Sequence, residues 1–295
     1  MSYRIGLDLG GTKVLGIVTD NEHKVVHRKK HRLSNRTDIS AVMDQISNVY
    51  FELEGQLGNE KIASVGIALP SPVDNKLGHA KHLTAFQEKE LPVRAMLKER
   101  TGVDIKLGND VNMATLAEYK FGAGRGVLSL FTFYPGTGLG GGYIYEGRLV
   151  TGFNSTAAEI GHVVIDIDGP LCKCGRHGCL EAIVSYHGIK TMLSEKLSSG
   201  AESVIDHTSF RAVDIFEAWR KGDQVISELL EYQARALGIG IANVINITGV
   251  ERIILGGTIY HELQDDLLPI IEKNAIKYAI GNGICLLYTS PSPRD

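Results

Sequence analysis

The sequence predicts an α/β protein made of two related lobes. A strand, a glycine-rich turn and a second strand follow one another twice, near residue 10 and near residue 139. Segments with helical spacing of apolar residues come after both patterns. Of the 295 residues, 43% are hydrophobic and 22% charged, which is typical of a globular chain large enough for two cores. We therefore expect a first lobe over residues 1–118 and a second over residues 119–283.

The first lobe is expected to open with three strands, over residues 3–9, 14–19 and 24–33. The first two form a hairpin, because the glycine turn leads directly into another apolar strand. Residues 39–57 carry apolar side chains at helical spacing after Asp38, a favourable N-cap residue. The remaining predicted elements are strands over 62–69 and 104–107 and helices over 91–100 and 112–119.

The second lobe is expected to begin with strands over residues 127–134 and 143–145. The residues between them, from Pro135 to Gly142, are predicted to form a turn. The rest of the lobe is mostly helical in its apolar spacing. Its predicted elements are helices over 183–197, 212–221 and 223–247, followed by a strand over 252–255.

Charge and cysteine content exclude several classes of protein. The net charge of −3 argues against a general nucleic-acid or membrane-surface binder. The basic residues from His27 to Arg32 lack interleaved aromatic side chains for base stacking, so we expect a solvated strand there. Neither a signal peptide nor a span of ~18 apolar residues is visible. Four cysteines do not make a disulfide scaffold, which favours a cytoplasmic protein.

Three cysteines within eight positions, together with an upstream histidine, predict a structural zinc site. The candidate ligands are Cys172, Cys174, Cys179 and His162, and His177 is an alternative fourth ligand. Two cysteines one residue apart bind the same ion only on a tight turn, which Gly175 and Gly178 make possible. A closed set of four ligands would fix the loop and thereby orient Glu159 and Glu181.

The two glycine turns predict binding of phosphate groups. Their residues are Gly10, Gly11, Thr12 and Lys13 in the first and Gly136, Thr137 and Gly138 in the second. Glycines allow backbone N–H groups to approach phosphate oxygens closely. Asp8, at the end of the first strand, could hold Mg²⁺ through water. The alternative is a pair of tight turns that merely need positive φ.

Two further positions have a structural and a functional interpretation. Asn109 and Asp110 end a short strand and precede a helix, and from spacing alone Asp110 is best interpreted as an N-cap. As a functional group, its carboxylate would accept a proton during phosphoryl transfer. Gly256 and Gly257 end the last predicted strand, where a simple turn and a nucleotide contact are equally reasonable.

The order of these motifs resembles the ROK family (repressors, open reading frames and sugar kinases), a branch of the superfamily of hexokinase, actin and Hsp70. The resemblance covers residues 5–257. The segments that carry it are residues 8–13, 70–74, 109–112, 136–142, 159–162 and 172–181, the last with the pattern Cys-x-Cys-Gly-x-x-Gly-Cys-x-Glu.

The resemblance implies an actin-like ATPase (ribonuclease H-like) fold, each lobe a mixed sheet with flanking helices, that closes over a sugar and ATP with Mg²⁺. It implies Asp110 as the catalytic base and a sugar-binding set of Asn109, Asp110, Glu159, His162 and Glu181. The two glycine turns match phosphate grips, Gly256 and Gly257 match the nucleotide side, and a homodimer is the family's usual assembly.

The implied activity is ATP-dependent phosphorylation of the 6-hydroxyl of an aldohexose, with glucose ahead of other sugars. The alternatives are N-acetylmannosamine or N-acetylglucosamine kinase activity, and a non-catalytic sugar-binding regulator. The chain departs from the family pattern at Ser71, where glycine is usual, and at Pro135, where an aliphatic residue is usual. Residues 284–295 lack the family's small-residue helix, and their Pro/Ser content predicts a disordered tail.

Overall fold

The computed structural model describes residues 2–83, 86–205, 210–280 and 286–289. The chain packs as two compact units, one of residues 1–113 with 152–156 and one of residues 114–151 with 157–295. We placed the boundary between the lobes after residue 118, whereas the units divide just before Ala114. No sequence pattern predicted that residues 152–156 belong to the first unit.

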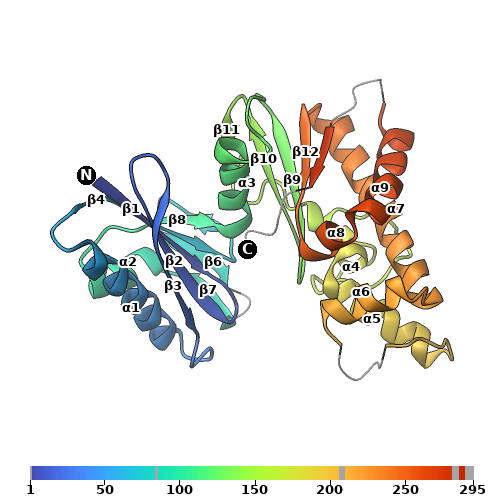
Figure 1. Cartoon of the computed structure of the whole chain (residues 1–295), viewed down its shortest axis with the longest axis horizontal. Coiled ribbons are helices and arrows are strands. Elements are labelled where there is room, and N and C mark those ends of the chain that lie inside the picture. Colours follow the sequence, from blue (N-terminus) through green and yellow to red (C-terminus); the bar gives the residue numbers. More distant parts are fainter. Residues whose placement is uncertain (1, 84–85, 206–209, 281–285, 290–295) are drawn as a thin grey trace. The chain divides into compact units, whose positions relative to one another are not determined.

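The first unit contains a five-stranded sheet in the order β3-β2-β1-β4-β8 (Figure 1). Its strands are β1 (Ser2–Leu9), β2 (Lys13–Thr19), β3 (Val25–Arg32), β4 (Lys61–Leu69) and β8 (Lys106–Asn109). The first three strands form an antiparallel meander, and β4 and β8 continue the sheet in parallel with β1. The carboxyl ends of β1, β4 and β8 therefore meet at one edge of the sheet.

Helix α1 (Ile39–Leu57) packs on β1, β2 and β3, and α2 (Val93–Thr101) lies beside it (Figure 1). The Asp38 carboxylate accepts hydrogen bonds from the N–H groups of Ser40 and Ala41, so it caps α1 as predicted. The helix turns a fully buried apolar face toward the sheet, formed by Val42, Met43, Ile46, Val49 and Leu53. This face supplies much of the first unit's core.

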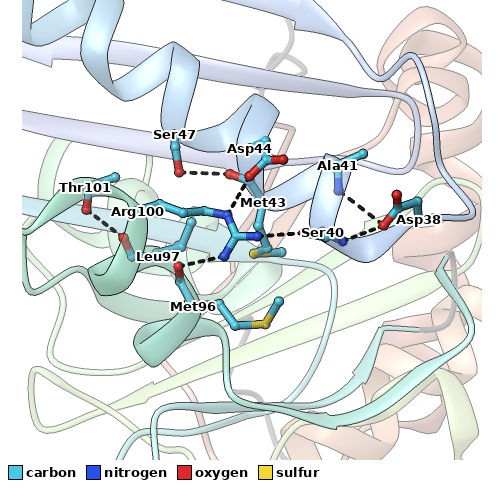
Figure 2. Close-up of polar contacts among 10 residues, drawn as sticks. All are labelled: Asp38, Ser40, Ala41, Met43, Asp44, Ser47, Met96, Leu97, Arg100 and Thr101. Carbon is cyan, nitrogen blue, oxygen red and sulfur yellow. Dashed lines mark hydrogen bonds and ion pairs between the residues drawn. The ribbon is translucent and has the colours of Figure 1, made fainter.

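The Arg100 guanidinium of α2 joins the two helices at their surface (Figure 2). Its Nε donates to Asp44 Oδ1 at 2.6 Å, and its Nη2 donates to Ser40 Oγ at 2.7 Å. Its Nη1 donates to the carbonyl of Met96, one turn earlier on α2. Two hydrogen bonds thus join α2 to α1, and the third holds the guanidinium on its own helix.

A small sheet of β5 (Val73–Asp74), β6 (His79–Leu83) and β7 (Glu88–Leu91) was not predicted. Its strands are too short to show an alternating pattern. The prediction that a helix begins at Leu91 was wrong, because Leu91 ends β7. Pro92 separates the strand from α2, whose first residue is Val93.

The second unit repeats the sheet topology of the first, with strand order β11-β10-β9-β12-β13. These strands are β9 (Leu130–Pro135), β10 (Leu139–Tyr145), β11 (Arg148–Leu149), β12 (Arg252–Leu255) and β13 (Leu286–Thr289). Again three antiparallel strands are followed by two that run parallel to the first. The same order and directions in both sheets confirm the predicted pair of related lobes.

Helices make up the rest of the second unit (Figure 1). They are α3 (Asp110–Phe121), which crosses the unit boundary, a 3-10 turn (Ile160–His162), α4 (Leu180–Val184), α5 (Tyr186–Ser198), α6 (Ala212–Arg220), α7 (Gln224–Thr248), α8 (Thr258–Glu262) and α9 (Gln264–Tyr278). The single helix predicted over 183–197 is divided at Ser185, whose hydroxyl accepts from the N–H of Gly188 and caps α5.

Two other expectations for this unit are corrected. Residues 139–142, predicted as part of a turn, belong to strand β10. A Cβ on Gly142 would stand 2.0 Å from Thr115 Oγ1, so the close packing of α3 explains this glycine. Four residues of the predicted disordered tail, Leu286–Thr289, form β13 beside β12, because an apolar segment can add to that strand's unpaired edge. The other tail residues lie outside the described part of the chain.

Candidate active site and metal cluster

Asp8, Asn109 and Asp110 lie at the same edge of the first unit's sheet. Asp8 is paired with Ala68 of β4, and Ala68 is paired with Gly108 of β8. Asp8 is exposed, whereas Asn109 and Asp110 are partly buried. The carboxyl edge of parallel strands is the usual location of ligand sites in open α/β sheets.

Asn109, and not Asp110, caps helix α3. The side-chain oxygen of Asn109 accepts from the N–H of Asn112 at 2.9 Å, which is the N-cap hydrogen bond. Its Nδ2 donates to Asp110 Oδ1 at 3.0 Å and to the carbonyl of Ser71 at 3.3 Å. The capping interpretation of Asp110 was therefore wrong, and the amide of Asn109 holds the Asp110 carboxylate in place.

Burial raises the pKa of Asp110 to about 6. The negative charge of Asp8 adds to the rise, while hydrogen bonds from the Val111 N–H and the Asn109 amide oppose it. A carboxylate with this pKa is ionised at neutral pH, yet it is a better proton acceptor than an ordinary aspartate.

Ser71 also contributes to this site, although the sequence analysis noted it only as a departure from the family pattern. Its hydroxyl accepts from the N–H of His82 at 2.9 Å and donates to the carbonyl of Pro72 at 2.8 Å. The residue is buried, and its own carbonyl accepts from Asn109. The Ser71 hydroxyl thus makes two hydrogen bonds beside the carbonyl that accepts from Asn109.

The turn between β1 and β2 contains Gly10, Gly11 and Thr12. The N–H of Gly10 donates to the carbonyl of Lys13 at 2.9 Å, and the carbonyl of Thr12 accepts from Leu33. Gly10 does not have positive φ, and a Cβ there would meet its nearest neighbour, the Lys13 oxygen, at 3.5 Å, which is ordinary contact. The fold itself does not require glycine at position 10, which favours the ligand interpretation over the simple turn.

In the turn between β9 and β10, the fold likewise does not require glycine at the first residue, Gly136. Gly136 does not have positive φ, and a Cβ there would meet no atom within 4 Å. Gly136 and Thr137 are exposed. Gly138 differs, since a Cβ on it would stand 2.5 Å from Glu181 Oε2.

Gly256 and Gly257 have structural reasons to be glycine. A Cβ on Gly256 would stand 2.3 Å from the Tyr134 ring, and one on Gly257 would stand 2.0 Å from the Pro135 carbonyl. Gly257 also has a φ of 96°, which other residues rarely adopt. Close packing on the end of β9 is thus sufficient to explain both glycines.

The predicted metal ligands lie together in the second unit. One ligand atom from each of His162, Cys172, Cys174 and Cys179 falls within 4.8 Å of every other. Cys174 Sγ and Cys179 Sγ are 3.6 Å apart, and Cys172 Sγ lies 3.9 Å from His162 Nδ1. Tetrahedral zinc with Zn–S bonds of ~2.3 Å places sulfurs ~3.8 Å apart, so these residues fit zinc.

The turn that gathers the cysteines has the conformation expected from its glycines. Gly175 and Gly178 have φ of 86° and 68°, and the N–H of Gly175 donates to the carbonyl of Cys172. His177, the alternative ligand, lies outside the cluster, and its Nδ1 is 3.0 Å from the carbonyl of Gly169.

The electrostatic surroundings of the three thiols differ. A hydrogen bond from Arg176 Nε lowers the pKa of Cys174 to about 6, so this thiol is readily ionised. Burial raises the pKa of Cys172 and raises that of Cys179 to about 12. A bound cation would have to displace the protons of both buried thiols.

Glu159 and Glu181 flank the cluster. Desolvation raises the pKa of Glu159, the imidazole of His162 opposes that rise, and the charge of Glu181 adds to it. Glu181 Oε2 accepts from the N–H of Leu139 at 2.9 Å, and Oε1 lies 3.9 Å from Cys172 Sγ. The second unit therefore brings the cluster, both glutamates and the Gly136 turn together.

Two named sugar kinases and one solved structure are similar to this chain over most of its length. A glucokinase of Thermotoga maritima is 32% identical over 276 residues, covering 91% of this chain and 86% of the relative. An N-acetylmannosamine kinase of Haemophilus influenzae is 30% identical over 275 residues, covering 91% and 84%. The crystal structure of a Streptomyces griseus ROK glucokinase with glucose and AMPPNP matches with a TM-score of 0.80 at 27% identity, covering 98% and 94%.

These neighbours confirm the predicted actin-like fold class. None of the described helices is long and apolar enough to cross a membrane. The family model matches residues 4–283, nearly the whole described chain. The chain belongs to the ROK family.

Proposed function

We propose that this protein, a ROK sugar kinase, transfers the γ-phosphoryl group of ATP to the 6-hydroxyl of an aldohexose, with glucose as the preferred acceptor. The observation that carries the proposal is the state of Asp110. Its carboxylate accepts a hydrogen bond from Asn109, which also caps helix α3 in its place, and burial raises its pKa to about 6. These are the properties that a general base for a sugar hydroxyl needs.

In this proposal Asp110 accepts the proton of the hydroxyl as its oxygen attacks the γ-phosphorus. The bond between this phosphorus and the oxygen that bridges it to the β-phosphate breaks, and ADP leaves. The N–H groups of Gly10 and Gly136 donate within their own turns, so other backbone N–H groups of these two turns would bind phosphate oxygens. Asp8 would hold Mg²⁺ through water. Mg²⁺ supplies charge neutralisation on the phosphates when bound. Gly256 and Gly257 are proposed on family grounds alone to border the nucleotide.

The sugar would be held by hydrogen bonds from Asn109, Glu159, His162 and Glu181. Leu139 already occupies Glu181 Oε2, which leaves Oε1 for a sugar hydroxyl. The Nδ1 atom of His162 lies toward Cys172, so Nε2 is the nitrogen suited to the sugar. The relatives include glucokinases and N-acetylmannosamine kinases at similar identity, and the choice between these sugars rests on assay.

A coupled assay of ADP release over glucose, N-acetylglucosamine and N-acetylmannosamine tests the activity. We expect the highest kcat/KM with glucose. Asp110→Asn should lower kcat at least 10³-fold while glucose binding, measured by calorimetry, stays within a few fold. Asp104→Asn, at an exposed carboxylate of the same unit, is the matched control. Sugar binding without turnover in the wild type would favour the alternative of a non-catalytic regulator.

We also propose that Cys172, Cys174, Cys179 and His162 hold a structural zinc ion. Metal analysis should find about one zinc per chain. Cys174→Ser should lose most of it, whereas His177→Ala should keep it, because His177 lies outside the cluster. A folded wild-type protein free of metal would contradict this assignment.

Family habit further leads us to propose a cytoplasmic homodimer. Sedimentation velocity at micromolar concentration tests the assembly. A single species with the mass of one chain would contradict it.

A further inference from the structure

One short segment, residues 181–187, makes three hydrogen bonds to the glycine turn at Gly136, which also has an internal hydrogen bond from the Gly136 N–H to the Gly138 carbonyl. The N–H of Leu139 donates to Glu181 Oε2 at 2.9 Å. The N–H of Tyr186 donates to the carbonyl of Gly136 at 2.9 Å, and that of His187 donates to the carbonyl of Thr137 at 3.4 Å. The same segment thus fixes both carbonyls at the start of the turn and the amide at its end.

This segment begins immediately after the metal cluster. Cys179 precedes the first residue of α4, and Glu181 lies in the first turn of that helix. Its Oε1 is 3.9 Å from Cys172 Sγ while Oε2 contacts the turn, so one carboxylate lies between the two. The packing is tight, since a Cβ on Gly138 would stand 2.5 Å from Glu181 Oε2 and the carboxylate would have to shift.

A second contact joins the cysteine loop to the same segment. Lys173, between two of the cysteines, has its Nζ 2.7 Å from Nε2 of His187. An ammonium group can only donate, so Nε2 accepts and the imidazole is neutral with its proton on Nδ1. Lys173 therefore links the loop to the residue whose N–H binds Thr137.

We propose that the metal cluster braces the Gly136 turn, so that a metal-loaded cysteine loop raises the affinity for nucleotide phosphates even when no sugar is bound. The inference rests on the proposed phosphate-binding role of this turn. Metal ligation fixes Cys172, Cys174 and Cys179. The backbone from Cys179 into α4 extends that order to Glu181 and so to the turn, and Lys173 extends it to His187. A turn whose N–H groups already point in fixed directions loses less conformational entropy on binding phosphate.

The experiment measures the Kd of Mg²⁺–AMPPNP by calorimetry without sugar. Lys173→Ala should keep one zinc per chain yet bind AMPPNP about 3- to 10-fold more weakly, with glucose affinity within twofold of wild type. His187→Ala should weaken AMPPNP binding equally, and the double variant should be no weaker than either single one. Lys190→Ala, an exposed lysine on the same helix, is the matched control and should not change the Kd.

Amide hydrogen exchange gives a readout independent of nucleotide. In zinc-stripped protein and in Lys173→Ala, the N–H groups of Leu139, Tyr186 and His187 should exchange faster, while those of Ile253 and Ile254 in β12 stay protected. Unchanged exchange at Leu139 after zinc removal would overturn the inference. So would weaker AMPPNP binding in Lys173→Ala alone, which would indicate a direct charge contact. Wild-type protein that fails to bind AMPPNP would instead refute the proposed function, and exchange would still decide the brace.

Discussion

Replacing Asp110 by asparagine should inactivate the protein and at the same time stabilise it at neutral pH. The folded state raises the pKa of this carboxyl from an ordinary 3.8 to about 6. The folded protein therefore binds the proton more tightly than the unfolded chain does. Its stability falls as pH rises from 3.8 to 6, and the whole cost is present above pH 6.

The size of the effect follows from the shift in pKa. A rise from 3.8 to about 6 corresponds to about 3 kcal/mol at most, since each unit is worth about 1.4 kcal/mol. Asparagine is neutral and its oxygen can still accept from Val111 and Asn109. We expect Asp110→Asn to gain about 2–3 kcal/mol at pH 8, and about half of that at pH 5.

Guanidinium unfolding at both pH values, followed by circular dichroism, measures the difference between variant and wild type. Asp104→Asn should show no such pH-dependent gain, because that carboxylate is exposed. If Asp110→Asn is less stable than the wild type at pH 8, burial does not destabilise the ionised carboxylate. The raised pKa that supports its role as a base is then wrong.

Three other outcomes follow from the structure. For the wild type, kcat/KM should decline about tenfold per pH unit below pH 6, as Asp110 becomes protonated; a flat profile down to pH 5 would contradict its role as base. Gly10→Ala should change the unfolding free energy by less than about 1 kcal/mol, yet weaken AMPPNP binding measured by calorimetry. Gly257→Ala should lower the unfolding free energy by about 3 kcal/mol or more, because this residue has a φ of 96° and contacts Pro135. Arg100→Ala should lower stability by about 1 kcal/mol, because its partner Asp44 is largely exposed, and leave KM for glucose unchanged; a kinetic defect in this variant would be unexpected.

Sequence patterns were most informative where an element was long or had a clear boundary. The helix over 39–57 and the strand over 252–255 were predicted with their observed limits, because Asp38 marks one start and apolar periodicity marks both. The helix over 183–197 failed at Ser185, since a serine inside an apolar period resembles an ordinary helical residue until its hydroxyl is seen to cap. Short strands such as β5 depend on pairing partners far along the chain, which no local pattern reveals.

The site shows the same division between local and long-range information. The sequence predicted that His162 and the three cysteines come together, with His177 as an alternative. The structure gathers those four residues and leaves His177 outside, and whether they bind metal stays a prediction. The roles of Asn109 and Asp110 could not be separated by spacing, because either can cap a helix. Which of the two does so depends on side-chain direction, and that is set by tertiary contacts with the segment around Ser71.

The return of residues 152–156 to the first unit has a practical meaning for dissecting this protein. Lys81 Nζ donates to the carbonyl of Asn154 at 3.1 Å, so this late segment is attached to the small sheet of the first unit. A fragment ending at residue 118 would lack that partner, and a protease cut at one peptide bond could not release a complete first unit. Separate production of the units would call for joining residue 113 to residues 152–156 through a designed linker.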